Sequence, residues 1–253
     1  MWKYIRVIFF NIIPIIYSYF TFILPCSRHP NKMPLEKRYK KIRKLVLRVL
    51  KYFKVDIRTN DLKDLFSHNK SSLIVCNHMS DIDPLIFIAL SEKPITFAGK
   101  KETEKYPLVG RCIKILEGKF LDRQDLKQQL RVMKEIQISL ETNDNLNWVI
   151  YPEGTRNKKP FDENILEFHH GTFRCAYKAK RDIYICAMFG TFRILKIDDK
   201  HKKYPVDFQF LTKISALDYQ NMTTTDISEK AYTLINEEVK KLREIDKELI
   251  SKY

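Results

Sequence analysis

The sequence predicts an α/β protein with a mostly parallel central sheet flanked by helices, preceded by an N-terminal membrane-associated helical segment. From residue 56 onward, short apolar runs alternate with longer amphipathic stretches, which is the pattern of strands joined by crossover helices. Residues 7–26 carry no charge over 20 positions, about the length of a helix that crosses a bilayer. We therefore expect a membrane anchor over residues 1–55 and one large domain over residues 56–253.

The composition narrows the classes of protein and partner. With 253 residues, 44% of them apolar, the chain is long and apolar enough to bury a sizeable core. Its five cysteines are scattered and form no Cys-x-x-Cys pair, which favours free thiols in a reducing compartment. The formal charge of +15 attracts polyanions, whether nucleic acid, anionic lipid, a phosphorylated substrate or an acidic carrier protein. Charge alone does not choose among these partners.

The apolar run at the N-terminus is typical of a segment that enters a membrane. Pro14 lies in the middle of residues 7–26 and disfavours a straight helix. A span across the bilayer and a helix that dips into one leaflet both fit the sequence. A cleaved signal peptide fits less well, because the run is long and no small-x-small cleavage site follows it. Aromatic and cationic residues typical of a headgroup interface precede the run: Trp2, Lys3, Tyr4 and Arg6.

Residues 35–55 show the spacing of a basic amphipathic helix. Such a helix suits an anionic bilayer surface, and the alternative is a helix packed on its own domain with a solvated basic side. Because the apolar run precedes it, we interpret the segment as part of an anchor that holds the domain at the cytoplasmic face of the cell membrane. The apolar side consists of Leu35, Tyr39, Ile42, Val46, Val49, Leu50 and Phe53, and the basic side of Lys37, Arg38, Lys41, Lys44, Arg48 and Lys51.

The elements of the domain follow from its alternating apolar runs. Strands are predicted over residues 71–77, 94–99, 118–122, 147–151, 182–190 and 204–214. Helices are predicted over residues 83–92, 123–142, 171–181 and 224–250. In sheets of this class, ligands bind beyond the carboxyl ends of the strands. Polar residues that directly follow a predicted strand are therefore the candidates for a site.

The stretch "HMSDIDP" follows the first predicted strand and carries His78, Asp81 and Asp83. A neutral imidazole can take a proton from a hydroxyl while a carboxylate on its other nitrogen fixes the tautomer. The hydroxyl would come from the substrate, because no protein nucleophile elbow is present. The structural alternative is that Asp83, which precedes Pro84, or Asp81 caps the next helix. Metal ligation lacks partners at a suitable spacing, and we expect no metal.

Two later strands also end in polar loops. The stretch "GKFLDR" carries Lys119 and Arg123, and "YPEGTR" carries Gly154 and Arg156. A guanidinium can bind phosphate through two hydrogen bonds, and a glycine lets backbone amides approach a ligand closely. The alternatives are solvated arginines and an ordinary turn.

Together, the three loops resemble the motifs of the glycerolipid acyltransferase family, and within it the bacterial-type 1-acyl-sn-glycerol-3-phosphate acyltransferases. The resemblance covers about residues 70–190. It implies that His78 is the general base and Asp83 its partner. It also implies a membrane-bound enzyme without metal or cofactor, with acyl-CoA or acyl-carrier protein as co-substrate. It assigns acceptor binding to Glu153, Gly154, Thr155 and Arg156, with Arg123 and Arg156 as phosphate contacts and Lys119 and Lys100 as weaker candidates.

The reaction implied by the resemblance is acyl transfer from the thioester to the sn-2 hydroxyl of lysophosphatidic acid, which gives phosphatidic acid for phospholipid biosynthesis. Another lysophospholipid or glycerol 3-phosphate is the alternative acceptor. A basic membrane-associated protein that binds nucleic acid is a remoter alternative, but the sequence shows no recognised nucleic-acid module. We therefore expect membrane lipids, lysophosphatidic acid and the thioester donor as partners, and no nucleic acid.

Two positions depart from the pattern of the family. Its fourth block is usually a strand with Pro-Val, where this chain has Cys186 and Ala187. The wall of the acyl pocket that this strand forms in the family is therefore not carried over to these residues. His169 and His170 stand where basic residues or proline are more familiar, and we expect them to face phosphate or solvent rather than a metal.

Overall fold

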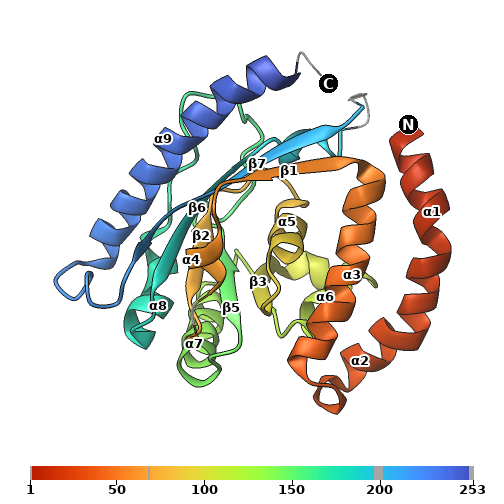
Figure 1. The fold of residues 1–253 in the computed structure, drawn as a ribbon. Helices are drawn as coiled ribbons and strands as arrows, with labels where there is room; N and C mark the ends of the chain where they lie inside the picture. Colours follow the sequence, from red (N-terminus) through yellow and green to blue (C-terminus); the bar gives the residue numbers. More distant parts are fainter. Residues whose placement is uncertain (1, 68, 197–201, 251–253) are drawn as a thin grey trace.

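A seven-stranded sheet forms the centre of the molecule (Figure 1). The computed structural model describes residues 2–67, 69–196 and 202–250, without the side chains of Trp2 and Lys3. The role at the membrane interface that was predicted for these two side chains therefore lies outside the described part. The strand order is β1-β7-β6-β2-β5-β3-β4, and every neighbouring pair is parallel except β6 and β7. This confirms the predicted fold class. The strands are β1 (Val55–Thr59), β2 (Leu73–Cys76), β3 (Ile95–Lys100), β4 (Lys119–Leu121), β5 (Asn147–Ile150), β6 (Ile183–Phe189) and β7 (Tyr204–Ile214).

Strands β2 to β7 coincide with the six predicted runs, whereas β1 was not predicted. Its sequence, "VDIRT", is short and alternates apolar with charged residues, so it lacks the apolar run that marks a buried strand. β1 lies at the edge of the sheet, where it pairs with β7 from Val55 to Thr59. An edge strand needs no apolar side chains on both faces, which explains why the sequence pattern missed it.

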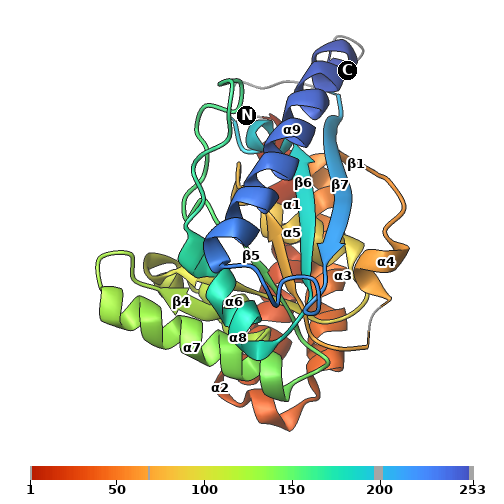
Figure 2. The same ribbon diagram turned by 90° about the vertical axis from the view of Figure 1, so that its left-hand side faces the viewer.

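Helices cover both faces of the sheet and enclose two apolar cores. α3, α5 and α6 pack into one core, while α7, α8 and α9 pack into the other, on the side that faces the viewer in Figure 2. The helices are α1 (Trp2–Ser18), α2 (Leu24–Arg28), α3 (Leu35–Phe53), α4 (Lys63–Phe66), α5 (Asp83–Leu90), α6 (Val109–Ile115), α7 (Leu126–Thr142), α8 (Arg174–Ala179) and α9 (Thr224–Ile250), with a π-helical turn, η1 (Tyr19–Ile23), and 3₁₀ turns η2 (Pro30–Lys32), η3 (Lys101–Lys105), η4 (His170–Phe173) and η5 (Thr191–Arg193).

The amphipathic helix predicted over residues 35–55 forms as α3, but its apolar side does not face a bilayer. Tyr39, Ile42 and Leu50 are buried in the same apolar core as α5. Arg38, assigned above to the basic side, is buried and pairs with Glu117. The apolar side of α3 therefore packs on the domain, which is the alternative stated above, and the assignment of residues 1–55 to a membrane anchor stays a prediction. Helical spacing shows that one side of a helix is apolar, but it does not show what covers that side.

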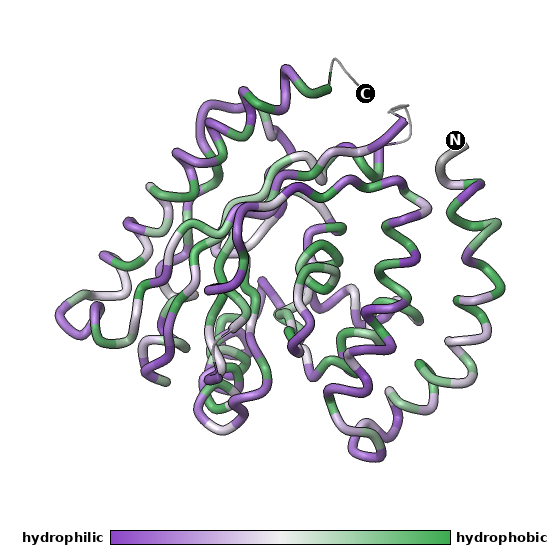
Figure 3. Tube along the Cα trace, in the orientation of Figure 1, coloured by the Kyte–Doolittle hydropathy of each residue, from purple (hydrophilic) through white to green (hydrophobic). Residues whose placement is uncertain are grey.

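α1 lies along the outer side of α3 (Figure 1), and Figure 3 shows it as hydrophobic along most of its length. Two guanidinium groups fasten it: Arg6 donates to the carbonyl of Tyr52 at 2.9 Å, and Arg48 donates to the carbonyl of Phe10 at 2.8 Å. Residues 4–28 are long and apolar enough to cross a membrane by length and composition. The domain covers one side of this segment, and the uncovered side exposes Ile5, Ile8, Phe9, Ile12, Ile13, Ile16, Tyr17 and Phe20.

Candidate active site

The first candidate loop starts where the central strand β2 ends. β2 is fully buried between β5 and β6. Directly after it, the Asn77 side chain accepts from the N–H of Met188 and donates to the carbonyl of Met188, both at 2.9 Å. The amide therefore continues the pairing between β2 and β6 by one residue. This fixes the point from which the chain leaves the sheet and presents His78.

His78 and Asp83 form a hydrogen-bonded pair at the carboxyl end of β2. The Nδ1 atom of His78 lies 2.7 Å from Oδ2 of Asp83. The His78 side chain is 14% exposed, whereas that of Asp83 is 1% exposed. An ionised carboxylate only accepts hydrogen bonds, so when a neutral imidazole pairs with it here, Nδ1 carries the proton and the lone pair lies on Nε2. The geometry is that of a base held by an orienting carboxylate.

The Asp83 carboxylate is bound by the loop and does not cap the helix that it starts. Its Oδ2 atom also accepts from the backbone N–H groups of Met79 at 2.7 Å and Ser80 at 2.9 Å. Its Oδ1 atom accepts from the hydroxyl of Thr191. No side chain caps the first turn of α5, so the capping alternative is wrong for Asp83. Four donors therefore compensate the burial of this charge.

The "PEGTR" loop holds the backbone of His78 from both sides. The N–H of His78 donates to Oε1 of Glu153 at 2.6 Å, and the carbonyl of His78 accepts from the N–H of Asn157 at 2.7 Å. The second carboxylate oxygen of Glu153 accepts from the N–H of Leu166 at 3.3 Å. Burial raises the pKa of Glu153 to about 8, against the lowering effect of the two N–H donors. In this structure Glu153 positions the loop that carries His78, and its role toward the acceptor stays a prediction.

Gly154 gives the same loop its shape. Its φ of 63° lies in the left-handed region, and a Cβ there would stand 2.9 Å from Cδ2 of the His169 ring. Any other residue would therefore be strained and would push against that imidazole. The N–H of Gly154 donates to the carbonyl of Tyr151, so it is not free for a ligand. Thr155 is exposed beside it.

Arg156 forms an ion pair across the two loops. Its guanidinium donates to Oδ2 of Asp81, with side-chain exposures of 45% and 66%. Asp81 therefore does not act as a helix cap either. An exposed pair of this kind is weak and easily exchanged for another anion. Arg156 thus lies on the loop that holds His78 and is accessible from solvent.

Tyr151 is a site residue that the sequence reasoning did not single out. Its ring stacks on the imidazole of His78, with centroids 4.1 Å apart and planes 14° apart. Its hydroxyl is buried and has no hydrogen-bond partner among the described residues. Burial raises the pKa of this phenol well above its ordinary value. The signal in the sequence was its position directly before "PEGTR", at the end of β5.

Thr191 was also missed, and no local signal marks it. It is fully buried at the start of η5, 108 residues after Asp83, whose carboxylate accepts its hydrogen bond. Only the pairing of β2 with β6 brings the two residues together. A sequence pattern cannot show this contact, because it depends on which strands are neighbours.

The remaining cationic candidates lie along the same edge of the sheet, on strands further from β2. Lys100 ends β3 and pairs with Glu102 at 3.4 Å. Arg123 follows β4, is exposed, and makes no ion pair within the described ranges. β3 and β4 are two and three strands from β2, which corresponds to roughly 10 and 14 Å at the usual strand spacing. The structure therefore groups His78, Asp83 and the "PEGTR" loop, and places these cations beside that group.

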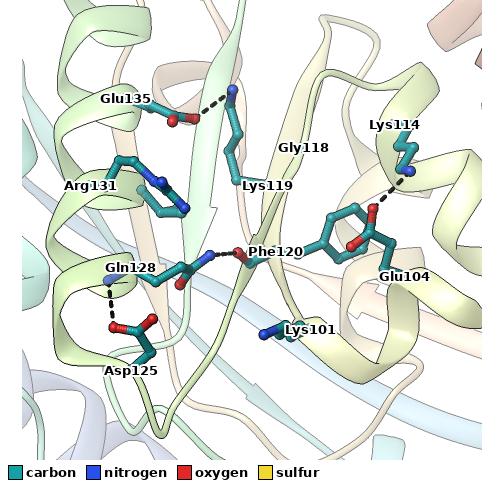
Figure 4. A pocket seen from close by; sticks show the side chains of 11 residues that line it. Lys101, Glu104, Lys114, Gly118, Lys119, Phe120, Asp125, Gln128, Arg131 and Glu135 are labelled. Atoms are coloured by element: carbon teal, nitrogen blue, oxygen red, sulfur yellow. Dashed lines mark hydrogen bonds and ion pairs between the residues drawn. The ribbon is translucent and has the colours of Figure 1, made fainter.

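Lys119 belongs to a separate hollow of about 550 Å³ at the outer edge of the sheet (Figure 4). The hollow lies beside β4, between α7 and the η3–α6 segment. Lys119 pairs there with Glu135 at 2.8 Å, and Lys114 pairs with Glu104 at 2.8 Å. Because Lys119 and Lys114 are paired and β4 lies three strands from β2, the hollow is a less favourable place for the acceptor phosphate than the loop that carries Arg156.

The two departures from the family's pattern fall in different places. Cys186 and Ala187 are buried on opposite faces of β6, one in each apolar core, so they form part of the sheet's packing. His169 is exposed and lies against Gly154, while His170 begins η4 and is also exposed. Among the described residues, no three His, Cys, Asp or Glu side chains converge as a metal site.

The fold and the site define a class of protein: a helix-covered, mostly parallel sheet with a histidine–carboxylate pair at the end of its central strand. The profile of the Acyltransferase family matches residues 56–189, just over half of the chain, and the chain belongs to this family.

Individual proteins are similar over longer stretches. A probable 1-acyl-sn-glycerol-3-phosphate acyltransferase of Mycoplasma pneumoniae is 26% identical over 221 residues, which cover 82% of this chain and 80% of that one. A 1-acyl-sn-glycerol-3-phosphate acyltransferase of Cocos nucifera is 25% identical over 185 residues, which cover 73% and 58%. The crystal structure of PlsC, the 1-acyl-sn-glycerophosphate (LPA) acyltransferase of Thermotoga maritima, superposes with a TM-score of 0.74 over 95% of this chain and 96% of that chain at 21% identity. This last similarity supports the fold.

Proposed function

We propose that this protein transfers a fatty acyl group from an acyl thioester to the sn-2 hydroxyl of lysophosphatidic acid and so makes phosphatidic acid. The observation that carries the proposal is the pair of His78 and Asp83, which leaves the lone pair of Nε2 free at the end of the central strand. Membership of the Acyltransferase family and the names of the similar proteins support the choice of reaction and acceptor.

The proposed transfer needs no covalent enzyme intermediate. Nε2 of His78 takes the proton of the sn-2 hydroxyl as its oxygen forms a bond to the thioester carbonyl carbon. The tetrahedral intermediate collapses, the carbon–sulfur bond breaks, and the thiolate of CoA or of the carrier protein takes the proton back from Nε2. Asp83 stabilises the imidazolium that exists between these steps. The N–H of Gly154 is engaged, which leaves those of Thr155 and Arg156 as the candidates for the oxyanion.

Acceptor recognition is proposed to rest on the phosphate. Arg156 lies on the loop that holds His78, and its exposed partner Asp81 is exchanged for the phosphate when the lipid binds. Arg123 is exposed at the end of β4 on the same edge and is free to bind the other side of the phosphate. Lys100 and Lys119 are the weaker candidates, because each has a carboxylate partner and also lies on a strand two or three places from β2. Fixing the phosphate in this way places the hydroxyl beside the base.

The membrane is proposed to lie against the uncovered side of α1. The domain covers the other side of this helix, through the Arg6 and Arg48 contacts described above. A helix with one side docked and the other apolar can sink into one leaflet, with its axis along the surface. This arrangement favours a helix that dips into one leaflet over a helix that spans the bilayer for residues 7–26. The domain is proposed to lie at the cytoplasmic face, where it takes the lipid acceptor from the bilayer.

The test is a reconstituted assay with purified protein in vesicles. Lysophosphatidic acid is supplied with acyl-CoA in one arm and acyl-carrier protein in another, and phosphatidic acid is measured. Formation of phosphatidic acid at enzyme-dependent rates supports the proposal. Faster acylation of another lysophospholipid or of glycerol 3-phosphate would change the acceptor. No transfer to any of these, together with salt-sensitive binding of nucleic acid, would overturn the proposed function.

A further inference from the structure

The chain turns sharply after β6, and this turn places Thr191 beside Asp83. Gly190 has a φ of 101°, and a Cβ at this position would stand 2.4 Å from the carbonyl oxygen of Pro205 on β7. A glycine is therefore required for η5 to start so close to the neighbouring strand. The fully buried residue that follows, Thr191, points its hydroxyl at Asp83.

The hydrogen bonds to Asp83 are divided unevenly between its two oxygens. Oδ2 accepts from His78 and from two backbone N–H groups. Oδ1 accepts from Thr191 at 2.5 Å, which is the one donor to this oxygen within the described ranges. A carboxylate that is held at both oxygens cannot rotate about its Cβ–Cγ bond. The direction of Oδ2 toward Nδ1, and through it the direction of the imidazole, therefore depends on the threonine hydroxyl together with the two backbone N–H groups.

The turn that carries Thr191 is itself fastened to the C-terminal helix. Arg193 donates two hydrogen bonds to Asp246 of α9, at 2.7 and 2.5 Å. The two side chains are 4% and 3% exposed. Burying two opposite charges costs desolvation energy, but the fixed geometry of the pair holds the turn at a defined position relative to α9. The guanidinium also stacks over the ring of Phe192 at 4.6 Å from its centroid.

We propose that Thr191 is a positioning residue for the pair of His78 and Asp83, and that α9 holds it in place through Asp246 and Arg193. The inference rests on the proposed function, because it assigns the threonine to the acyl-transfer reaction. It predicts that the hydroxyl acts on turnover through Asp83. Acceptor binding, which depends on the arginines, should be unaffected.

The test compares Thr191→Val and Thr191→Ser with wild type in the vesicle assay. Valine keeps the shape without the hydroxyl. We expect kcat to fall about 10- to 100-fold, the size of the loss when the hydrogen-bond partner of a metal-binding side chain is removed, with KM for lysophosphatidic acid within about twofold. Serine restores the hydroxyl and should restore kcat to within about threefold of wild type. Thr96→Val is the matched control, since Thr96 is a fully buried threonine whose hydroxyl has no partner within the described ranges.

A double-mutant cycle distinguishes an effect of Thr191 through the Asp83 carboxylate from an effect on the packing around Thr191. In an Asp83→Asn background, Thr191→Val should change kcat by less than about twofold, because the carboxylate through which the hydroxyl acts is gone. An effect of Thr191→Val that is equally large in both backgrounds would overturn the proposal. So would a kcat equal to wild type in Thr191→Val. If wild type itself makes no phosphatidic acid, the proposed function fails instead, and the two failures are thereby distinguished.

The role of α9 is tested by replacing both members of the ion pair, Arg193→Met with Asp246→Leu. The nearby buried Asp207 keeps its ion pair with Arg58 in this variant. Folding is checked by the unfolding temperature. We expect a folded protein with kcat lowered about tenfold, in which adding Thr191→Val costs less than it does in wild type. A folded double variant with the turnover of wild type would overturn the part assigned to α9. Failure to fold would do the same, since it would show the pair to be required for the fold itself.

Discussion

Glu153→Gln tests whether the buried carboxyl group that holds His78 makes the stability of the fold depend on pH. Glu153 accepts hydrogen bonds from the N–H groups of His78 and Leu166, and it is 3% exposed. Burial raises its pKa from an ordinary 4.5 to about 8. Glutamine keeps the shape of the side chain but does not titrate, so the difference between the two proteins isolates this one group.

The sign of the effect follows from the proton that each state binds. Between pH 4.5 and about 8, the folded chain holds a proton on Glu153 that the unfolded chain has released, so the free energy of unfolding falls as pH rises. The limiting slope is about 1.4 kcal/mol per pH unit, which gives an upper limit of about 5 kcal/mol over the whole window. Below the unfolded pKa the contribution is fully present, and above about pH 8 no further loss occurs.

The assay is urea unfolding in detergent from about pH 5 to about pH 9, with Glu163→Gln as the control, because Glu163 is exposed in the segment that follows the same loop. The stability of wild type minus that of Glu153→Gln should fall across the window and then level off. Other titrating groups cancel in this difference. A difference that is flat or that rises with pH would refute the assignment of the raised pKa to Glu153.

Three further predictions concern the surface and the stacked ring. Asp81→Ala frees Arg156 from an exposed ion pair worth about 0.2–1 kcal/mol, so KM for lysophosphatidic acid should fall by about 1.4- to 5-fold, and a raised KM would contradict the phosphate role. Ile13→Glu, at a residue 75% exposed on α1, should weaken binding to vesicles in a flotation assay, whereas Leu217→Glu, 76% exposed elsewhere, should not; equal effects would argue against α1 as the membrane-facing side. Tyr151→Phe removes a buried hydroxyl without a partner in the described ranges and should raise unfolding stability by about 1 kcal/mol with kcat unchanged; a loss of stability would show that the hydroxyl is bonded.

The sequence predicted the local part of the site because its residues are close in the chain. His78 and Asp83 are five residues apart, and the turn between them brings the ring to the carboxylate. The same reasoning placed the "PEGTR" loop at a strand end, but it could not show that Glu153 points inward to the backbone of His78. That contact depends on β2 and β5 being neighbours, which no local pattern specifies.

The sequence predicted well the elements that an apolar run marks as buried. It predicted poorly the elements whose role depends on which part of the protein covers them. β2, β5 and β6 are buried on both faces, and their apolar runs marked them clearly. α3 was assigned to the membrane because its spacing is amphipathic, yet its apolar side packs into the core. The sequence did not indicate Thr191 for a related reason. Its contact with Asp83 depends on the pairing of β2 with β6.

The most direct test of the account is acyl transfer by His78→Ala in the vesicle assay, beside His29→Ala as a control at an exposed histidine. Loss of a general base costs about 100- to 10,000-fold in rate, so His78→Ala should make phosphatidic acid at least 100 times more slowly than wild type, while His29→Ala should not differ. Turnover by a folded His78→Ala protein within tenfold of wild type would contradict the assignment of His78 as the base.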